Sequence, residues 1–203
     1  MSAHSTAVTG EHFDYIAERT QQDDAFLREL KDAAAKAGLP AIWISPEEAS
    51  YLQIVLRSGK AREVVEVGTL AGYSAIAMAR ALPDGGRVRT IEFEAKHADF
   101  AEAWAGRSDV ASKVKVLRGD GREVLKSIES DSADAMFIDA DKAGYETYFR
   151  EALRIVRKGG LILCDNALAF GHVLDRDSDD ASVRHIQRFN EIVPKEPRVQ
   201  AVL

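Results

Sequence analysis

The chain has a single cysteine among its 203 residues, which excludes an internal disulfide. Cys164 lies in an apolar run, so an inert, buried thiol is its expected role. No apolar run approaches the roughly 18 residues that a membrane-spanning helix needs. Residues 1–10 also lack the basic flank and apolar stretch of a signal peptide. We therefore expect a protein of the reducing cytoplasm.

Basic charge is also scarce in this sequence. It has 27 Lys and Arg residues against 33 Asp and Glu residues, a formal net charge of −6 and a pI of about 5.4. Nucleic-acid binding depends on clustered Lys and Arg, so this balance argues against it. A coenzyme A ester would need a basic patch for its phosphates, and Arg19, Arg28 and Lys31 are too dispersed to provide one. The expected partner is a small molecule.

What the sequence does contain is a regular alternation of strand and helix patterns. Two helical patterns come first, at residues 23–37 and after Ser45, where Pro46 and Glu48 complete a helix-start signature. Short apolar strand patterns follow, with helical patterns between them, at residues 64–68, 87–93, 114–117, 135–138 and 161–164. This order predicts an α/β fold, in which a parallel sheet is wound with helices on both faces.

The remaining pattern completes one predicted domain. A helix is expected at residues 145–156, a further helix follows the fifth strand, and residues 198–203 look like a last strand. No repeat, low-complexity tract or linker interrupts the chain. We therefore expect a single domain over residues 1–203, with a helical region at 1–60 and an α/β core at 61–203.

Polar side chains lie where the fourth and fifth strand patterns end. Asp139 follows one strand, and Asp165 and Asn166 follow the other. Ligands bind beyond the carboxyl ends of the strands in such sheets. Three hard oxygen ligands would suit Mg²⁺ or a similar divalent ion, and Lys142 lies close by in the sequence. Each of the three side chains could instead cap a helix or make a turn, so this pattern alone leaves both roles open.

A glycine-containing loop joins the first strand pattern to the next helix. Between Glu66 and Ser74, Gly68 and Gly72 let the backbone approach a ligand and bring the start of the helix close to it. Leu70 occupies the place of the second close glycine of a dinucleotide-binding loop, so that motif is absent. The loop alone is weak evidence for a ligand.

Two further segments predict a nucleoside pocket beside this loop. Glu92 ends the second strand, where a carboxylate can accept hydrogen bonds from both hydroxyls of a ribose. Asp120, Gly121 and Arg122 follow the third strand and could line an adenine. Taken singly, Glu92 could be a solvated carboxylate and the second segment an ordinary turn. With the glycine loop, they outline an adenosine pocket.

In order and spacing, these motifs resemble the metal-dependent, S-adenosylmethionine-using O-methyltransferases of the catechol and caffeoyl-CoA type. The resemblance runs from about Leu27 to Leu203. Its motifs are Glu66-Val-Gly68-Thr69-Leu-Ala-Gly72-Tyr73-Ser74, Ile91-Glu92, Gly119-Asp120, Phe137-Ile-Asp139-Ala-Asp141-Lys142 and Asp165-Asn166. The implied fold is the Rossmann-like fold of class I methyltransferases, with six parallel strands and one antiparallel strand near the end.

The resemblance implies contacts to the cofactor, S-adenosylmethionine. The residues implied around its methionine part are Glu66, Gly68 and Ser74, with Thr69, Gly72 and Tyr73 as further cofactor contacts from the same loop. The residues implied at the ribose and the adenine are Glu92 and, in turn, Asp120, Gly121 and Arg122.

The resemblance also implies the reaction, which is methyl transfer to a hydroxyl of a vicinal diol. Asp139, Asp165 and Asn166 would hold Mg²⁺, and Lys142 would act as the base that removes the hydroxyl proton. Asp139 would bind the metal, contact the cofactor and take part in catalysis. Asp141 is left without a ligand role, and we expect it to cap the next helix.

The chain departs from the family at its end, and two other functions stay open. Members run on through a Gly-rich turn into a final antiparallel strand, which we expect to be missing here. The resemblance also implies a homodimer. One alternative is an Mg²⁺-dependent phosphohydrolase that uses Asp139 and Asp141, although that motif usually lies on the first strand. The other alternative is a catalytically silent protein that binds S-adenosylmethionine.

Overall fold

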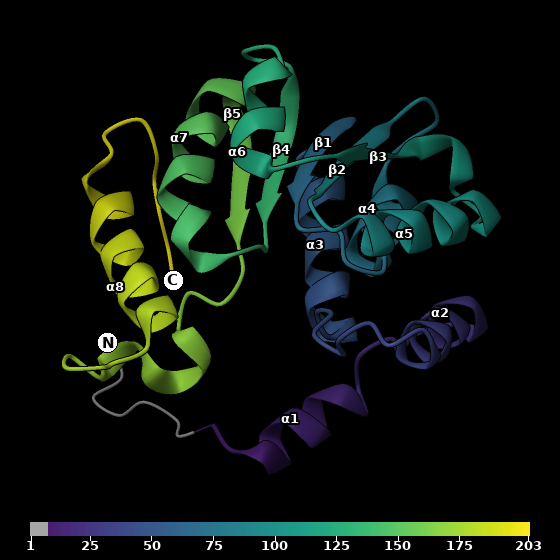
Figure 1. The fold of residues 1–203 in the computed structure, drawn as a ribbon, viewed down its shortest axis with the longest axis horizontal. Helices are drawn as coiled ribbons and strands as arrows, with labels where there is room; N and C mark the ends of the chain where they lie inside the picture. Colours follow the sequence, from purple (N-terminus) through teal and green to yellow (C-terminus); the bar gives the residue numbers. More distant parts are fainter. Residues whose placement is uncertain (1–7) are drawn as a thin grey trace.

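The structure is built around a five-stranded parallel sheet (Figure 1). The computed structural model describes residues 8–203. Most of residues 1–10, which we expect to contain no signal peptide, therefore lies outside the described part of the chain. The strands are β1 (Glu63–Val67), β2 (Arg87–Glu92), β3 (Val114–Arg118), β4 (Ala133–Ile138) and β5 (Val156–Cys164). Their order is β3-β2-β1-β4-β5, and every neighbouring pair is parallel. The order reverses beside β1, so the carboxyl ends of β1 and β4 flank the usual ligand position of such sheets.

Helices cover both faces of this sheet (Figure 1). The α-helices are α1 (Gly10–Ala17), α2 (Ala25–Lys36), α3 (Pro46–Ser58), α4 (Tyr73–Ala81), α5 (Ala95–Arg107), α6 (Gly121–Val124), α7 (Tyr145–Ile155) and α8 (Ala181–Ile192). The short 3₁₀ turns are η1 (Ala111–Lys113), η2 (Leu125–Ser127), η3 (Lys142–Gly144), η4 (Ala169–Leu174) and η5 (Val193–Lys195). Over residues 8–203, no helix combines the length and the apolar character that crossing a membrane requires.

Alternate strand residues enter two separate apolar cores. Val64 and Phe137 pack with α2, α3, α4 and α5, whereas their neighbours Val65 and Met136 pack with α7 and α8. All four side chains are buried. Because successive side chains on a strand point to opposite faces, both faces of β1 and β4 must be apolar. This is why the central strands appear in the sequence as continuous apolar runs.

The predicted helix starts are confirmed. The Ser45 hydroxyl accepts a hydrogen bond from the Glu48 N–H at 3.1 Å, and the Glu48 carboxylate accepts one from the Ser45 N–H at 2.8 Å. Pro46 is the first residue of α3. At the start of α2, the Asp24 carboxylate accepts from the Leu27 N–H at 2.9 Å. These local signals fix where each helix begins.

Other expectations about element boundaries are wrong. Three helices precede the first strand, because α1 was not predicted; it has no buried residue, so it lacks the apolar face that would reveal it. Residues 198–203 form no strand, and the apolar Val202 is 92% exposed there. The described residues give five parallel strands, where the resemblance implies six. β5 begins earlier than predicted, at Val156, and its register with β4 shifts before Leu161.

The carboxyl ends of β1 and β4 approach each other closely at Gly68. Its φ is +97°, and a Cβ atom added there would lie 1.8 Å from the backbone oxygen of Asp139. The sheet hydrogen bonds continue one residue past the strands, from the Asp139 N–H to the Val67 carbonyl at 2.9 Å. The Asp165 N–H likewise donates to the Ile138 carbonyl at 3.0 Å. The loop after β1 and the polar residues after β4 and β5 are therefore fixed side by side.

Replacing Gly68 with Ala tests this close approach. Gly68→Ala should lower the free energy of unfolding by about 3 kcal/mol or more, because the methyl group overlaps the Asp139 carbonyl and φ is positive. Gly106→Ala in α5 is the matched control, since an added Cβ there meets no atom within 4 Å. It should be neutral or stabilising. Urea unfolding measures both, and equal stability of the two variants would contradict the close approach.

Candidate active site

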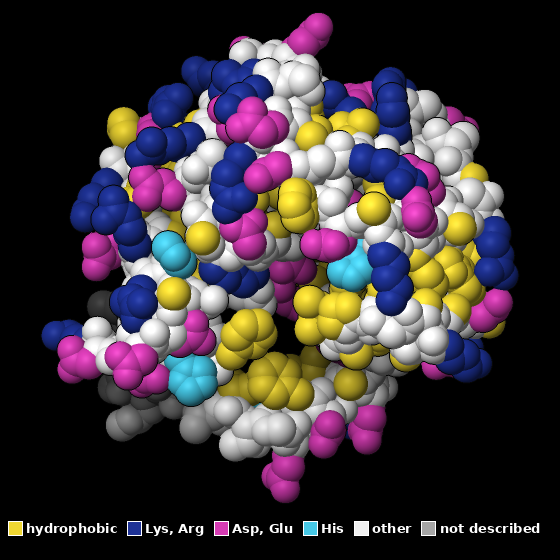
Figure 2. All heavy atoms as spheres, in the orientation of Figure 1, with side chains coloured by type: hydrophobic (Ala, Val, Ile, Leu, Met, Phe, Trp, Pro, Cys, Tyr) yellow, Lys and Arg dark blue, Asp and Glu magenta, His cyan; other side chains and the backbone are white. Residues whose placement is uncertain are grey.

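A cavity of about 1050 Å³ opens where the strands end. Figure 2 shows a hollow on this view of the molecule, with hydrophobic side chains around it and acidic side chains deeper inside. The predicted site residues that line the cavity are Gly68, Thr69, Tyr73, Ser74, Glu92, Asp120, Gly121, Arg122, Asp139, Lys142, Asp165 and Asn166. They come from the carboxyl ends of all five strands. Most of the predicted site is thus brought together at one place.

Glu66 and Gly72 are the two predicted residues that do not line the cavity. Gly72 starts α4 with φ +84°, and a Cβ added there would lie 3.3 Å from the Ala101 side chain, so it serves the packing of α4 against α5. Glu66 is fully buried, and one of its carboxyl oxygens accepts from the Ser74 hydroxyl at 2.5 Å. The other carboxyl oxygen has no hydrogen-bond partner among the described residues. Burial raises the pKa of Glu66 to about 8.

The Glu92 carboxylate holds the glycine-containing loop in place. One of its oxygens accepts from the backbone N–H groups of Thr69 and Leu70, at 3.1 and 2.8 Å. The other accepts from the Glu94 N–H at 2.9 Å. Glu92, the residue predicted to bind the ribose, therefore also determines the shape of the loop. His97 Nδ1 lies 3.7 Å from this carboxylate, and His97 also lines the cavity.

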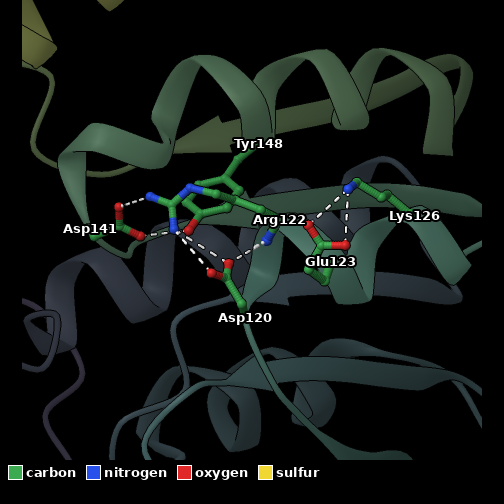
Figure 3. A network of polar contacts seen from close by, with 6 residues as sticks. All are labelled: Asp120, Arg122, Glu123, Lys126, Asp141 and Tyr148. Atoms are coloured by element: carbon green, nitrogen blue, oxygen red, sulfur yellow. Dashed lines mark hydrogen bonds and ion pairs between the residues drawn. The ribbon is translucent and has the colours of Figure 1, made fainter.

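Arg122 joins two acidic residues from different strand ends (Figure 3). Its guanidinium lies 3.4 Å from the Asp120 carboxylate, contacts the Asp141 carboxylate and lies 5.6 Å above the Tyr148 ring. The Tyr148 hydroxyl donates to Asp141 at 2.5 Å. Asp120 also caps α6 by accepting from the Arg122 N–H at 2.8 Å. This network forms the wall at the predicted adenine end of the cavity.

The role expected for Asp141 is therefore wrong. Asp141 makes no side-chain cap hydrogen bond to the following turn, because its carboxylate is held by Arg122 and Tyr148 instead. The arrangement also argues against the phosphohydrolase alternative. In that chemistry Asp139 and Asp141 would face one phosphate as nucleophile and acid, whereas here the Asp141 carboxylate is held in an ion pair with Arg122.

Asp139, Asp165 and Lys142 form the acidic end of the cavity. The Lys142 ammonium lies 3.5 Å from an Asp139 oxygen. One Asp165 oxygen accepts from the Asn166 N–H at 2.6 Å. Burial, followed by the negative charge of Asp165, raises the pKa of Asp139 to about 6. Two partly buried carboxylates thus share one nearby cation.

Glu48 is a third carboxylate at this end, although the sequence pattern indicated it only as part of the start of α3. It lines the cavity, and burial together with the negative charge of Asp165 raises its pKa. In residues 8–203, no three His, Cys, Asp or Glu side chains are arranged as a metal site. The candidate ligands remain Asp139, Asp165 and the Asn166 amide, whose hard oxygens suit Mg²⁺. A cation there would also offset the surplus negative charge.

Tyr145 connects Lys142 to the ends of two strands, a role the sequence did not reveal. The Lys142 ammonium donates to the Tyr145 hydroxyl at 2.7 Å. That hydroxyl in turn donates to the backbone carbonyl of Asp165 at 3.2 Å and lies 3.4 Å from that of Ile138. The Tyr145 side chain is fully buried. It therefore holds the lysine nitrogen at a defined place beside Asp139.

Comparison with known proteins gives this site a context. Residues 17–203 match the profile of an O-methyltransferase family. The chain is 38% identical over 192 residues to a catechol O-methyltransferase from Niastella koreensis, covering 93% of this chain and 87% of the relative. It is 35% identical to a catechol O-methyltransferase from Mycobacterium tuberculosis, covering 88% and 81%. The crystal structure of an O-methyltransferase from Bacillus cereus in complex with SAH has a TM-score of 0.88 and 39% identity, covering 93% and 87%.

The buried carboxyl of Glu66 predicts a pH-dependent stability. Because its pKa rises from 4.5 in the unfolded chain to about 8 in the fold, the folded chain holds a proton that the unfolded chain has released between these values. Stability should therefore fall as pH rises through this window. In Glu66→Gln the neutral amide removes the effect. Relative to the wild type, the free energy of unfolding of the variant should therefore rise by on the order of 4 kcal/mol between about pH 5 and pH 9.

Urea unfolding across this pH range measures the difference. Glu123→Gln is the control, because the Glu123 carboxylate is exposed on α6 and should leave the slope unchanged. Parallel stability profiles for the wild type and Glu66→Gln would show that Glu66 is ionised in the fold.

Proposed function

The chain belongs to the O-methyltransferase family and is an S-adenosylmethionine-dependent O-methyltransferase; we propose that its acceptor is a catechol held by a divalent metal ion. One observation carries the proposal. The candidate metal ligands Asp139, Asp165 and Asn166 line the same cavity as the glycine-containing loop and Glu92. A bound methyl donor and a metal-held acceptor would therefore meet in one enclosed space.

The donor half of the cavity is suited to an adenosine. S-adenosylmethionine, when bound, supplies an electrophilic methyl group for in-line displacement by a hydroxyl oxygen, where positioning contributes much of the acceleration. Glu92 would accept hydrogen bonds from the ribose, and the wall formed by Asp120 and Arg122 would border the adenine. Ser74 and the Gly68 backbone would contact the methionine part, with Glu66 acting through Ser74.

The acceptor half is suited to a vicinal diol. Asp139, Asp165 and Asn166 would hold Mg²⁺, which when bound fixes both hydroxyl oxygens of a catechol and makes them more acidic. Lys142 would accept the proton that the reacting hydroxyl loses. Tyr145 would direct the Lys142 nitrogen through its hydrogen bond at 2.7 Å. The carboxylates of the acidic end would keep this half selective for cations.

Removing one carboxylate tests the metal. Asp165→Ala should abolish Mg²⁺-stimulated methylation of catechol, while calorimetry finds S-adenosylmethionine binding within about twofold of the wild type. Asp177→Ala, in an exposed loop, is the control and should keep full turnover. Full activity of the wild type in excess chelator would contradict the metal role. S-adenosylmethionine binding without any methylation of catechol would favour the catalytically silent alternative.

Two substitutions test the base and the residue that holds it. Lys142→Met should lower kcat by about 100-fold or more, since general-base catalysis contributes that much. Tyr145→Phe removes the hydroxyl that accepts from Lys142 and donates to the Asp165 carbonyl, so kcat should fall by about tenfold, with an altered pH profile. Tyr51→Phe on the exposed face of α3 is the control and should behave as wild type. Wild-type rates across the pH range for Lys142→Met would remove the lysine as base.

A further inference from the structure

A second cavity, of about 430 Å³, opens where β2 and β3 begin. Its lining residues belong to the turn before β2 and to the start of β3, and none of them lines the active-site cavity. β2 spans six residues from Arg87, at this cavity, to Glu92, at the active site. The two ends of the strand are therefore about 16 Å apart. The second cavity is a separate candidate for ligand binding.

Three of the seven residues that line this cavity are cations, although the chain has a net charge of −6. They are Arg87, Lys113 and Lys115. Arg87 lies 3.4 Å from the Glu63 carboxylate. The Lys113 ammonium donates to the backbone carbonyl of Leu82 at 2.7 Å, and neither lysine forms an ion pair with any of residues 8–203. Two of the three lining cations are thus free of a carboxylate.

A fourth cation, Arg62, lies beside the cavity. Its guanidinium donates to the backbone carbonyl of Asp84 at 2.9 Å, and a Cβ added at Gly85 would lie 3.4 Å from it. The Asp134 carboxylate accepts from the backbone N–H of Arg62 at 2.7 Å, but its ion pair is with Arg157. Within the described part of the chain, the Arg62 side chain has no carboxylate partner. Positive charge therefore exceeds negative charge around the cavity.

Like charges also face each other across the strands at this end of the sheet. Arg89 on β2 pairs in register with Lys115 on β3, so the two side chains share a face of the sheet, together with Arg87. Such a pair destabilises a sheet. The Arg89 Nε is moreover buried without a hydrogen-bond partner among the described residues. A bound anion would offset the repulsion and supply the missing partner.

We propose that this cavity binds a small anion that carries more than one phosphate group, independently of methyl transfer. Arg87, Lys113 and Lys115 would contact it from the cavity wall, with Arg62 and Arg89 beside them. Guanidinium and ammonium groups are the side chains that bind phosphate best. Residues on one face of a strand lie about 6.6 Å apart, and neighbouring strands about 4.8 Å, so these cations spread beyond a single phosphate. The cavity volume is that of a small-molecule site.

Calorimetry with inorganic pyrophosphate tests the site. In metal-free buffer at constant ionic strength, we expect one pyrophosphate bound per chain, and an affinity for inorganic phosphate that is about tenfold weaker or less. Saturating S-adenosylhomocysteine should leave the pyrophosphate affinity within about twofold, because the two cavities share no residue. The proposal is overturned if binding does not saturate, if phosphate binds as tightly as pyrophosphate, or if S-adenosylhomocysteine displaces pyrophosphate.

Substitution of the facing cations tests which residues bind. Lys115→Gln and Arg89→Gln should each weaken pyrophosphate binding by about tenfold or more. Without the anion, Lys115→Gln should unfold at a Tm no lower than that of the wild type, because it removes the repulsion with Arg89. Lys158→Gln is the charge-matched control, an exposed lysine of β5 outside the cavity, and should bind within about twofold of the wild type. Equal weakening in Lys158→Gln and Lys115→Gln would show that net charge alone attracts the anion and would overturn the site, as would wild-type binding by Lys115→Gln.

Discussion

The site depends on the close approach of two backbones, at Gly68 after β1 and at Asp139 after β4. With no side chain at Gly68, the Asp139 carbonyl lies where a Cβ would otherwise be. The sheet hydrogen bonds continue through Asp139 and Asp165. The glycine-containing loop and the acidic end of the cavity are consequently parts of one rigid ladder. Donor and acceptor halves therefore need no conformational change to be adjacent.

Charge is distributed unevenly along the cavity, and this separates its two halves. At the adenine end, Arg122 is balanced by Asp120 and Asp141. At the acidic end, Glu48, Asp139 and Asp165 lie near one lysine, and burial with mutual repulsion raises the pKa values of Glu48 and Asp139. Such a cluster favours the entry of a cation.

Much of this arrangement could be predicted from the sequence, because it depends on local patterns. The apolar strands, the capping box at Ser45 and the polar residues after β4 and β5 are all encoded within a few neighbouring residues. The errors arise at residues whose structure depends on partners that are distant in the sequence. Asp141 is held by Arg122 from another strand end, and residues 198–203 have strand-like composition but no strand to pair with. Tyr145 and Glu48 were missed for the same reason, since each is brought to the site by its proximity to Asp165, which lies far away in the sequence.

The most direct test is a crystal structure of the protein with S-adenosylhomocysteine, Mn²⁺ and 4-methylcatechol, with anomalous scattering used to locate the manganese. We predict one Mn²⁺ bound by Asp139, Asp165 and Asn166, with both catechol oxygens on that ion. Manganese bound elsewhere, or a catechol that lies away from these three ligands, would contradict the central claim that the strand ends build a single metal-dependent methyl-transfer site.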